Sequence, residues 1–449
     1  MSSHILYYRA EIAALLFDLL RGGESAAIVG SASMGKSRLL LFLQRADVQQ
    51  HYLGEAAAHT VLLPTDCNRL AEKSDWGLYE LLLTALIEGL GSRLPAATHE
   101  WLNALRREAI TGRNALLAQR HLELATHTLC RDHGLRLCFL LDEFDESYRT
   151  LPATALANLR ALRDADRYQV CFVLLMRDHP GRLRTREDSE GFYELLSRSV
   201  LGLKPYRDAD ARQVIAQIAA RRGRAWREAE IATMLRLSGG HPGSLVALSD
   251  ALTRQPLPAE ADAQLRWALA QPALVEEFRK LWQGLAEDER LALSRLAQGI
   301  GAPYTLREVL ALKGLIRDEN REQPIFFSPA FHQYVLDEGV LSASALWLDE
   351  AAAVVWVEGK RIEDLSKLEY ELLRLLYRRL GQVCSRDDIL SALYPTETLD
   401  EDHAGSENRI DSLVRHLRRA IEPDARQPRY LLTVRGHGYR LVDTPAPLE

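Results

Sequence analysis

The amino-acid sequence predicts an α/β fold in which a parallel sheet is covered by helices on both faces. From about residue 20 to residue 205, short apolar runs alternate with longer helical patterns, an order typical of buried parallel strands joined by helices. After residue 205 the pattern becomes helical, and after residue 345 it is mixed again. The runs predicted as strands are SAAIVG (25–30), HTVLLP (59–64), LRLCFLLD (135–142), YQVCFVLLM (168–176) and SVLGLK (199–204).

The chain is expected to form three or four domains, because 449 residues exceed what one hydrophobic core ordinarily holds. The predicted division is a core at 1–205, a helical lid at 206–270, a short helical or winged domain at 271–342 and a C-terminal module at 345–445. Within the lid, two glycines at 239 and 240 are expected to end a helix.

Composition indicates a folded protein of the cytoplasm. Hydrophobic residues make up 47% of the chain and charged residues 26%, and no apolar run is long enough to cross a bilayer. The N-terminus has no basic segment followed by an apolar one, so we expect no signal peptide and no membrane association. The five cysteines are scattered without a CxxC pair, which argues against a zinc ribbon or a thioredoxin-like site.

A nucleotide-binding motif follows the first predicted strand. Gly30-Ser31-Ala32-Ser33-Met34-Gly35-Lys36-Ser37 fits GxxxxGK[ST], and a helical pattern follows it. The glycines let backbone N–H groups surround a phosphate at a helix N-terminus. Lys36 is expected to reach the β- and γ-phosphates, Ser37 to coordinate Mg²⁺, and the adjacent Arg38 to contact the nucleotide. A chance match in a Gly/Ser loop is the alternative, which the strand and helix on either side disfavour.

A second motif ends the third predicted strand. LCFLLDEFDE at 137–146 is an apolar run followed by acids, the pattern of a Walker-B strand. Asp142 is expected to hold Mg²⁺ through water, and Glu143 to orient or deprotonate the attacking water. A strand end followed by solvated acids is the alternative for this pair taken alone.

With these motifs in order, residues 1–340 resemble the AAA+ and STAND classes of P-loop NTPases, including Orc/Cdc6-like and TnsC-like ATPases. The resemblance implies ATP or ADP with Mg²⁺ as cofactors and a homo-oligomer formed on ATP binding. It places Arg177 at the sensor-1 position and Arg198 at the place of an arginine finger or base-positioning arginine. SGGHPGSLVAL resembles the GxP motif of the lid, so Gly240, His241 and Pro242 would contact the nucleotide. For each arginine and for this turn, a structural role is the alternative.

Two positions depart from the STAND pattern or match it loosely. STAND proteins usually open with a Gly-Arg-Glu-type segment that surrounds the adenine, whereas this chain has Arg9 and Glu11 but Tyr8 in place of the glycine. Adenine preference is therefore inferred from the resemblance. In the third predicted domain, SPAFHQYVL looks like a winged-helix segment, where His332 would either act as a nucleotide-sensing histidine or be a helix histidine of structural role.

The C-terminal module carries a local excess of positive charge. From residue 408 to 440 there are eight arginines against Asp411, Glu422 and Asp424, although the whole chain has a net charge of −6. Apolar residues at helical spacing form one face of the helix beginning near Glu407, which leaves the basic residues on the others. Arginine suits bidentate contacts with guanine edges and phosphates. The residues expected to contact DNA are Arg409, Ser412, Arg415, His416 and Arg419 on the helix, and Arg435 and His437 on the following hairpin.

The stretch from Leu346 to Val442 resembles the winged-helix DNA-binding domain of OmpR/PhoB-type response regulators. ENRIDSLVRHLRRAI matches their recognition helix and YLLTVRGHGYRLV their wing. The alternatives are a solvated basic face or a winged helix that binds protein.

Together the resemblances imply an ATP-dependent switch that binds double-stranded DNA, most simply a STAND-type transcription regulator that hydrolyses ATP slowly. The other hypotheses are an ATPase of a mobile-element or antiphage defence system, which acts with a separate protein partner or effector, and a scaffold with a vestigial nucleotide site. Intact Lys36, Ser37, Asp142 and Glu143 argue against the scaffold.

Overall fold

The computed structural model describes residues 6–317, 324–339, 346–349, 354–357, 360–362, 365–394 and 403–442. The chain forms two compact units. The first comprises Met1–Gly284, Val309–Arg317 and Ile325–Phe331, and the second comprises Leu285–Glu308, Asp318–Pro324 and His332–Glu449. The chain therefore passes from one unit to the other inside the third predicted domain. The predicted division into four domains stays a prediction.

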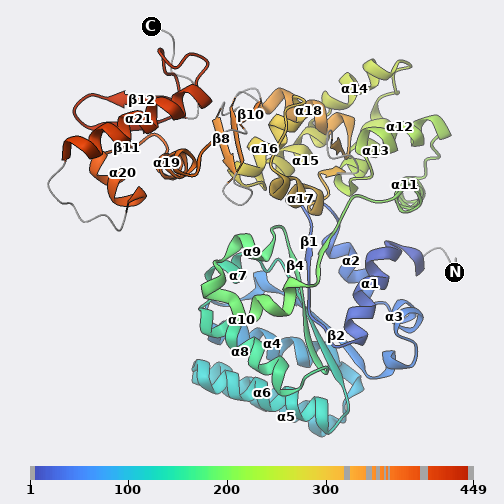
Figure 1. The fold of residues 1–449 in the computed structure, drawn as a ribbon. Coiled ribbons are helices and arrows are strands. Elements are labelled where there is room, and N and C mark those ends of the chain that lie inside the picture. Colours follow the sequence, from blue (N-terminus) through green and yellow to red (C-terminus); the bar gives the residue numbers. More distant parts are fainter. Residues whose placement is uncertain are drawn as a thin grey trace. The chain divides into compact units, whose positions relative to one another are not determined.

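A five-stranded parallel sheet is the centre of the first unit (Figure 1). Its strands lie in the order β2-β3-β4-β1-β5, so β4 separates the strand that precedes the GxxxxGK[ST] motif from the strand that ends at Asp142. The carboxyl ends of parallel strands meet at one edge of the sheet, which brings both motifs to that edge. The strands are β1 (Ala26–Val29), β2 (Thr60–Asp66), β3 (Arg136–Asp142), β4 (Val170–Met176) and β5 (Val200–Gly202). All five sequence predictions of strands are confirmed.

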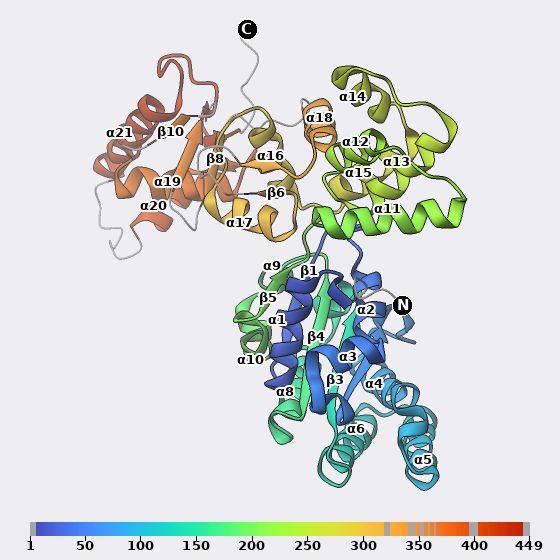
Figure 2. The same ribbon diagram turned by 90° about the vertical axis from the view of Figure 1, so that its right-hand side faces the viewer.

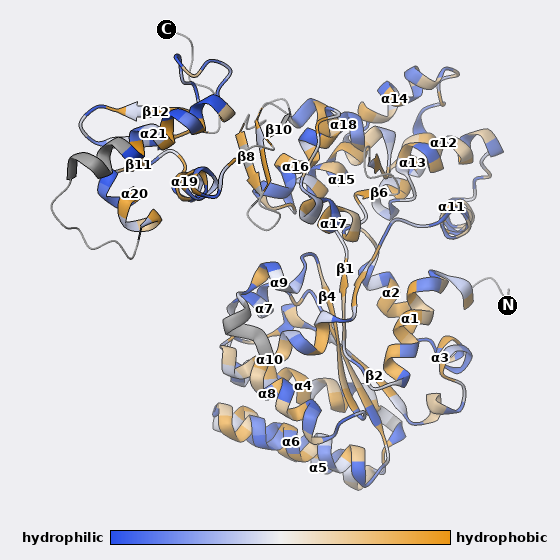
Figure 3. Ribbon diagram, viewed as in Figure 1, coloured by the Kyte–Doolittle hydropathy of each residue, from blue (hydrophilic) through white to orange (hydrophobic). Residues whose placement is uncertain are grey.

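Helices cover both faces of this sheet, because its central strands are apolar on both sides (Figures 2 and 3). One face packs against α4 (Asp75–Leu90), α6 (Ala115–Arg131), α8 (Ala153–Ala165) and α10 (Arg186–Ser197), with α5 (Ala96–Gly112) lying over α4 and α6. The remaining helices of this part are α1 (Ala10–Arg21), α2 (Lys36–Leu43), α3 (Ala46–Leu53), α7 (Asp145–Thr150) and α9 (Pro180–Leu183).

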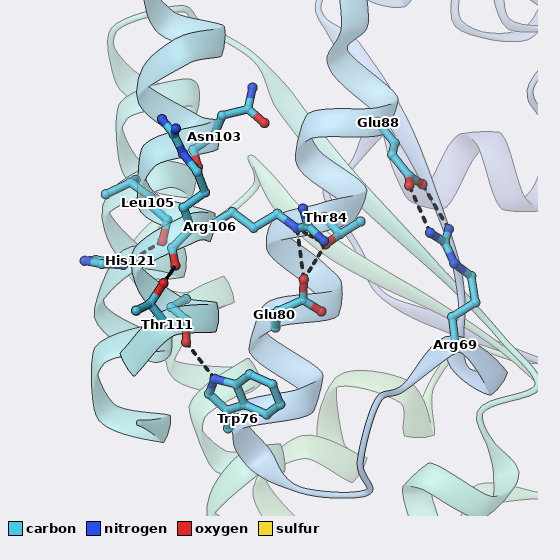
Figure 4. Close-up of polar contacts among 12 residues, drawn as sticks. Arg69, Trp76, Glu80, Thr84, Glu88, Asn103, Leu105, Arg106, Thr111 and His121 are labelled. Atoms are coloured by element: carbon cyan, nitrogen blue, oxygen red, sulfur yellow. Dashed lines mark hydrogen bonds and ion pairs between the residues drawn. The ribbon is translucent and has the colours of Figure 1, made fainter. Parts of the chain in front are cut away.

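Three helices form the connection from β2 to β3, and side-chain hydrogen bonds fix them to one another (Figure 4). The Trp76 indole N–H donates to the Ala109 carbonyl at 2.9 Å. The Arg106 Nε donates to both the Glu80 carboxylate at 2.9 Å and the Thr84 hydroxyl at 2.6 Å. These bonds join α5 to α4 beside the shared apolar core.

The rest of the first unit is mainly helical, as predicted. It contains α11 (Asp208–Arg222), α12 (Glu228–Ser238), α13 (Pro242–Arg254), α14 (Ala261–Leu269), α15 (Pro272–Gln283), β6 (Ile316–Arg317) and β7 (Ile325–Phe326). Gly239 caps the C-terminus of α12 with φ 56°. It packs so closely that a Cβ there would lie 1.7 Å from the Phe327 carbonyl oxygen. The following Gly240 also has positive φ, at 80°.

The second unit contains the C-terminal winged-helix domain. Its antiparallel sheets have the orders β10-β9-β8 and β11-β13-β12, and α19, α20 and α21 pack between them around one apolar core. The elements are α16 (Glu287–Ala297), β8 (Leu346–Asp349), β9 (Val354–Val357), β10 (Lys360–Ile362), α19 (Lys367–Arg378), β11 (Val383–Cys384), α20 (Arg386–Leu393), α21 (His403–Ile421), β12 (Leu431–Val434) and β13 (Gly438–Leu441). The predicted hairpin at Gly436 and Gly438 is the β12–β13 pair.

Two helices of the third predicted domain cross the boundary between the units. They are α17 (Tyr304–Leu312) and α18 (Pro329–Gly339). Within the second unit, Gly301 lies against Trp356 of β9 so closely that a Cβ would be 2.9 Å from the ring. The segment before α17 is thus packed against the β8–β10 sheet. A winged-helix character for residues 271–342 stays a prediction.

Candidate nucleotide and DNA sites

The GxxxxGK[ST] loop has the backbone geometry of a phosphate-binding loop. It follows β1 directly and contains two residues with left-handed backbone, Ser33 at φ 53° and Gly35 at φ 88°, before α2 begins at Lys36. Within the described part of the chain, no acceptor bonds the backbone N–H groups of Ser33, Gly35 or Lys36. Such N–H groups at a helix N-terminus form a concave anion site. These residues therefore fit a bound phosphate.

Lys36 lies folded over this loop. Its side chain is 6% exposed, and Nζ donates to the Gly30 carbonyl at 2.8 Å. Burial lowers the pKa of Lys36, while the nearby Glu143 carboxylate opposes that shift. Ser37, one residue further along α2, is exposed. Arg38 is exposed as well, donates to Gln217 of α11, and lies 5.5 Å from the centre of the Tyr8 ring.

Four successive loop residues are each contacted by a different distant segment of the first unit. The contacts are the Ser31 hydroxyl to the Lys313 carbonyl at 3.1 Å, His241 Nε2 to the Ala32 carbonyl at 3.2 Å, Ser33 to the Glu277 carboxylate, and Arg9 Nη2 to the Met34 carbonyl at 2.7 Å. The N-terminal segment, the lid and the third predicted domain therefore all hold the same loop. The bonds from His241 and Arg9 fix the carbonyls of Ala32 and Met34 in place. The neighbouring N–H groups of the loop are left to bind an anion.

His241 has its tautomer set by these bonds. Its Nδ1 accepts the backbone N–H of Ser244 at 3.2 Å, which caps α13. Because Nδ1 accepts, Nε2 carries the proton of the neutral ring and donates to Ala32. The side chain is fully buried, and this burial lowers the pKa of His241 to about 4. The following Pro242 lies near Gly35, as its Cγ would be 3.6 Å from a Cβ there.

Arg9 and the tyrosines beside it connect the N-terminal segment to the loop. Arg9 has φ 49°, donates Nη1 to the Lys204 carbonyl at 2.6 Å, and lies 4.4 Å from the centre of the Tyr206 ring. The hydroxyls of Tyr8 and Tyr206 are 2.7 Å apart. Burial, reinforced by the neighbouring Tyr206, raises the pKa of Tyr8. Tyr8, the residue that departs from the STAND pattern, thus packs against Tyr206 beside the phosphate loop.

The acidic residues after β3 meet the loop that follows β4. Glu143 has φ 50°, and its Oε2 accepts from Arg177 Nη2 at 2.9 Å. The Asp145 carboxylate accepts the backbone N–H groups of Arg177 at 2.9 Å and Asp178 at 3.0 Å. Burial raises the pKa of both Asp142 and Asp145. The structure therefore brings Asp142, Glu143 and Arg177 to the edge of the sheet where Lys36 lies.

Arg198 does not lie at this edge of the sheet. Arg198 is exposed at the end of α10 and precedes β5, whose Val200 is level with Ala27 of β1. It is therefore at the amino end of the sheet, whereas the phosphate loop follows the carboxyl end. His332 belongs to the second unit, and its Nε2 lies 3.0 Å from the Ala297 carbonyl.

The predicted DNA-contacting helix α21 has a basic face opposite its buried face. At about 100° per residue, Arg409, Ser412, Arg415, His416 and Arg419 fall within an arc of about 120°. Ile410, Val414, Leu417 and Ile421 are buried on the other side. The arginines at 409, 415 and 419 are exposed, as is His416, whose ring lies 3.8 Å from the Glu369 carboxylate. The wing residues Arg435 and His437 are exposed.

Other polar residues of this module hold its shape. Arg418 donates to the Leu431 carbonyl at 2.7 Å and to the Thr433 hydroxyl at 2.8 Å, which ties α21 to β12. The buried Glu422 carboxylate accepts three consecutive backbone N–H groups, those of Arg429, Tyr430 and Leu431. These contacts leave the opposite face of α21 to solvent.

Comparison with known families identifies the larger, N-terminal part of the chain. Residues 2–271 match the family described as Novel STAND NTPase 1, which is more than half of the chain. The chain belongs to this STAND family. The C-terminal part of this STAND protein, residues 359–441, matches the family described as the C-terminal domain of transcriptional regulatory proteins. It is thus a STAND NTPase fused to a response-regulator-type DNA-binding domain.

Curated relatives of this STAND protein include transcriptional regulators. The "DNA-binding dual master transcriptional regulator RpaA" of Synechocystis is 35% identical over 31% of this chain and 52% of its own length. The alkaline phosphatase synthesis regulator PhoP of Bacillus subtilis is 40% identical over 18% of this chain and 31% of its own. The chain spans about half the length of the first of these relatives.

Solved structures similar to this chain include a Walker-type ATPase of Pyrococcus abyssi, at 17% identity and a TM-score of 0.47. The match covers 73% of this chain and 95% of that one. The ORC2 protein of Aeropyrum pernix in its ADP form is 15% identical with a TM-score of 0.43, and the match covers 78% of this chain and 88% of that one.

Sequence reasoning found the residues that stand in motifs and missed those that reach the STAND site from outside them. Lys313 and Glu277 belong to no motif, and nothing local in the sequence distinguishes them. Asp145 carried a signal, since it lies within the acidic stretch after β3. Its role in holding the next loop follows only from the adjacency of β3 and β4.

Proposed function

We propose that this STAND protein is a DNA-binding transcription regulator whose nucleotide state controls its winged-helix domain. The observation that supports the proposal most is one chain that joins a STAND nucleotide site to a response-regulator-type DNA-binding module. We expect the protein to act in the cytoplasm, because ATP, Mg²⁺ and chromosomal DNA would all be available there.

The nucleotide would be held by the loop from Gly30 to Gly35 together with Lys36. Ser37 and Asp142 would hold Mg²⁺, which neutralises charge on the phosphates when bound. Glu143 is the residue we assign to accept a proton from water, and Arg177 holds its carboxylate in place. Arg38, Gly240, His241 and Pro242 complete the predicted contacts, of which His241 acts by fixing the loop.

Arg198 would act on a neighbouring subunit. Its position at the amino end of the sheet puts it out of reach of the phosphate loop in its own chain. An arginine that completes the site of the next subunit would make hydrolysis depend on assembly, so we propose a homo-oligomer in the ATP state. A partner protein could supply the stimulus.

The DNA contacts would come from the basic face of α21 in the major groove and from Arg435 and His437 beside it. The test is fluorescence anisotropy with a random-sequence duplex, measured with ATPγS, with ADP and without nucleotide at two salt concentrations. Affinity should change with nucleotide and fall with salt. Replacing Arg415 and Arg419 by alanine should reduce the slope of log K against log salt by about 2, since each phosphate contact contributes about 0.9.

Arg374→Ala is the matched control, because Arg374 is a half-buried arginine of the same module that pairs with Glu371 on α19. It should leave the affinity and slope unchanged. Binding that ignores nucleotide would refute the switch. No binding in any state would favour a protein-binding winged helix.

A further inference from the structure

Lys313 is a buried lysine that the proposed reaction does not use. It lies between α17 and β6 in the first unit, and its side chain is 1% exposed. Its ammonium forms an ion pair with Asp178, whose side chain is 23% exposed. A charged side chain at this depth is rare unless a partner holds it.

The Lys313–Asp178 ion pair holds the loop that carries Arg177. The backbone N–H of Asp178 donates to Asp145 at 3.0 Å, and the preceding N–H of Arg177 donates to the same carboxylate. Asp145 therefore holds this loop by its backbone, and Lys313 holds it by the Asp178 side chain. The Arg177 side chain leaves from this fixed segment and reaches Glu143 at 2.9 Å.

The backbone of Lys313 contacts the phosphate loop from the other side. Its carbonyl accepts the Ser31 hydroxyl at 3.1 Å. The turn around it is closely packed within the first unit. A Cβ on Gly314, which has φ 74°, would lie 2.8 Å from Pro205, and a Cβ on Gly202 would lie 2.4 Å from the Leu312 carbonyl oxygen. The turn has little freedom to shift, so one residue links the phosphate loop and the Arg177 loop at a fixed spacing.

We propose that Lys313 is a positioning residue that sets the distance between the phosphate loop and the Arg177–Glu143 pair, and thereby the recognition of the γ-phosphate. The inference rests on the proposed nucleotide site and not on DNA binding. If the ion pair had only a structural role, the double variant would recover both the Tm and the nucleotide preference. The reason is that replacing both partners of a buried pair by uncharged residues often leaves stability unchanged.

The experiment compares Lys313→Met, Asp178→Asn and the double variant, with Lys73→Met as control. Lys73 is an exposed lysine whose ion pair with Glu146 also joins distant segments of the first unit. Equilibrium affinities for fluorescent ATPγS and ADP analogues with Mg²⁺ are measured, together with the Tm of each protein. The ratio of the two affinities reports recognition of the γ-phosphate independently of hydrolysis.

Each single variant should lower the preference for ATPγS over ADP by about tenfold, the effect of misplacing one charge-assisted contact, and leave the ADP affinity within about twofold. Each should also lower the Tm, since one buried charge loses its partner. The double variant should recover most of the Tm but not the preference. Lys73→Met should change neither.

An unchanged preference in Lys313→Met would overturn the inference, as would a double variant that recovers both Tm and preference. A wild-type protein with no preference for ATPγS would refute this inference and the proposed switch together. A preference that falls as expected, in a protein whose DNA affinity ignores nucleotide, would refute the switch alone.

Discussion

His241 should make the stability of the first unit depend on pH, because the folded protein holds its ring neutral. The pKa of His241 falls from 6.5 to about 4 on folding. The unfolded chain therefore binds the proton first as the pH falls, so stability is fully present above pH 6.5 and is lost between pH 6.5 and 4. Linkage with these two values gives a loss of about 2 kcal/mol at pH 5 and about 3 kcal/mol at pH 4.

The cause of this loss can be checked by a variant that keeps the helix cap. In His241→Asn, the side-chain oxygen can still accept the Ser244 N–H, because asparagine is a favoured N-cap residue, but it cannot titrate. Urea unfolding of wild type and variant at pH 7.5 and pH 5, followed by a probe in the first unit, gives the difference at each pH while other titrations cancel.

The stability gap between wild type and His241→Asn should shrink by about 2 kcal/mol on going from pH 7.5 to pH 5. The same pH dependence in both proteins would refute the reasoning. It would mean that His241 does not hold its proton-free Nδ1 against Ser244 in the folded protein.

Three further predictions follow from single contacts. Glu143→Gln should retain nucleotide binding but slow hydrolysis by at least about a hundredfold, the typical contribution of a general base. Equal single-turnover rates for wild type and this variant would show that Glu143, with its partner Arg177, is not involved. Glu422→Gln should lower the unfolding free energy of the second unit by about 2 kcal/mol, since a neutral amide replaces a buried carboxylate that accepts three N–H groups. Thermal unfolding of the second unit measures this loss. Gly239→Ala should prevent stable folding or lower the Tm markedly, because the positive φ and the Phe327 carbonyl leave no room for a Cβ, and an unchanged melting curve would contradict this packing.

The sequence by itself determined the elements that depend on local chemistry. Strand positions follow from short apolar runs, and the phosphate loop follows from glycine spacing between a strand and a helix. The basic face of α21 follows from helical periodicity, because residues three and four apart share a face whatever the rest of the chain does. In the same way Glu143 was found as the acid that follows an apolar strand.

Only the tertiary structure decided which distant groups reach the loop. Arg9, Glu277 and Lys313 each contact it from a different segment, and no local spacing encodes such a meeting, because it depends on how the helical part packs on the sheet. The same reason separates Arg198 from the site. Its place in the sequence matches a motif, but the parallel register of β5 with β1 puts it at the opposite end of the sheet.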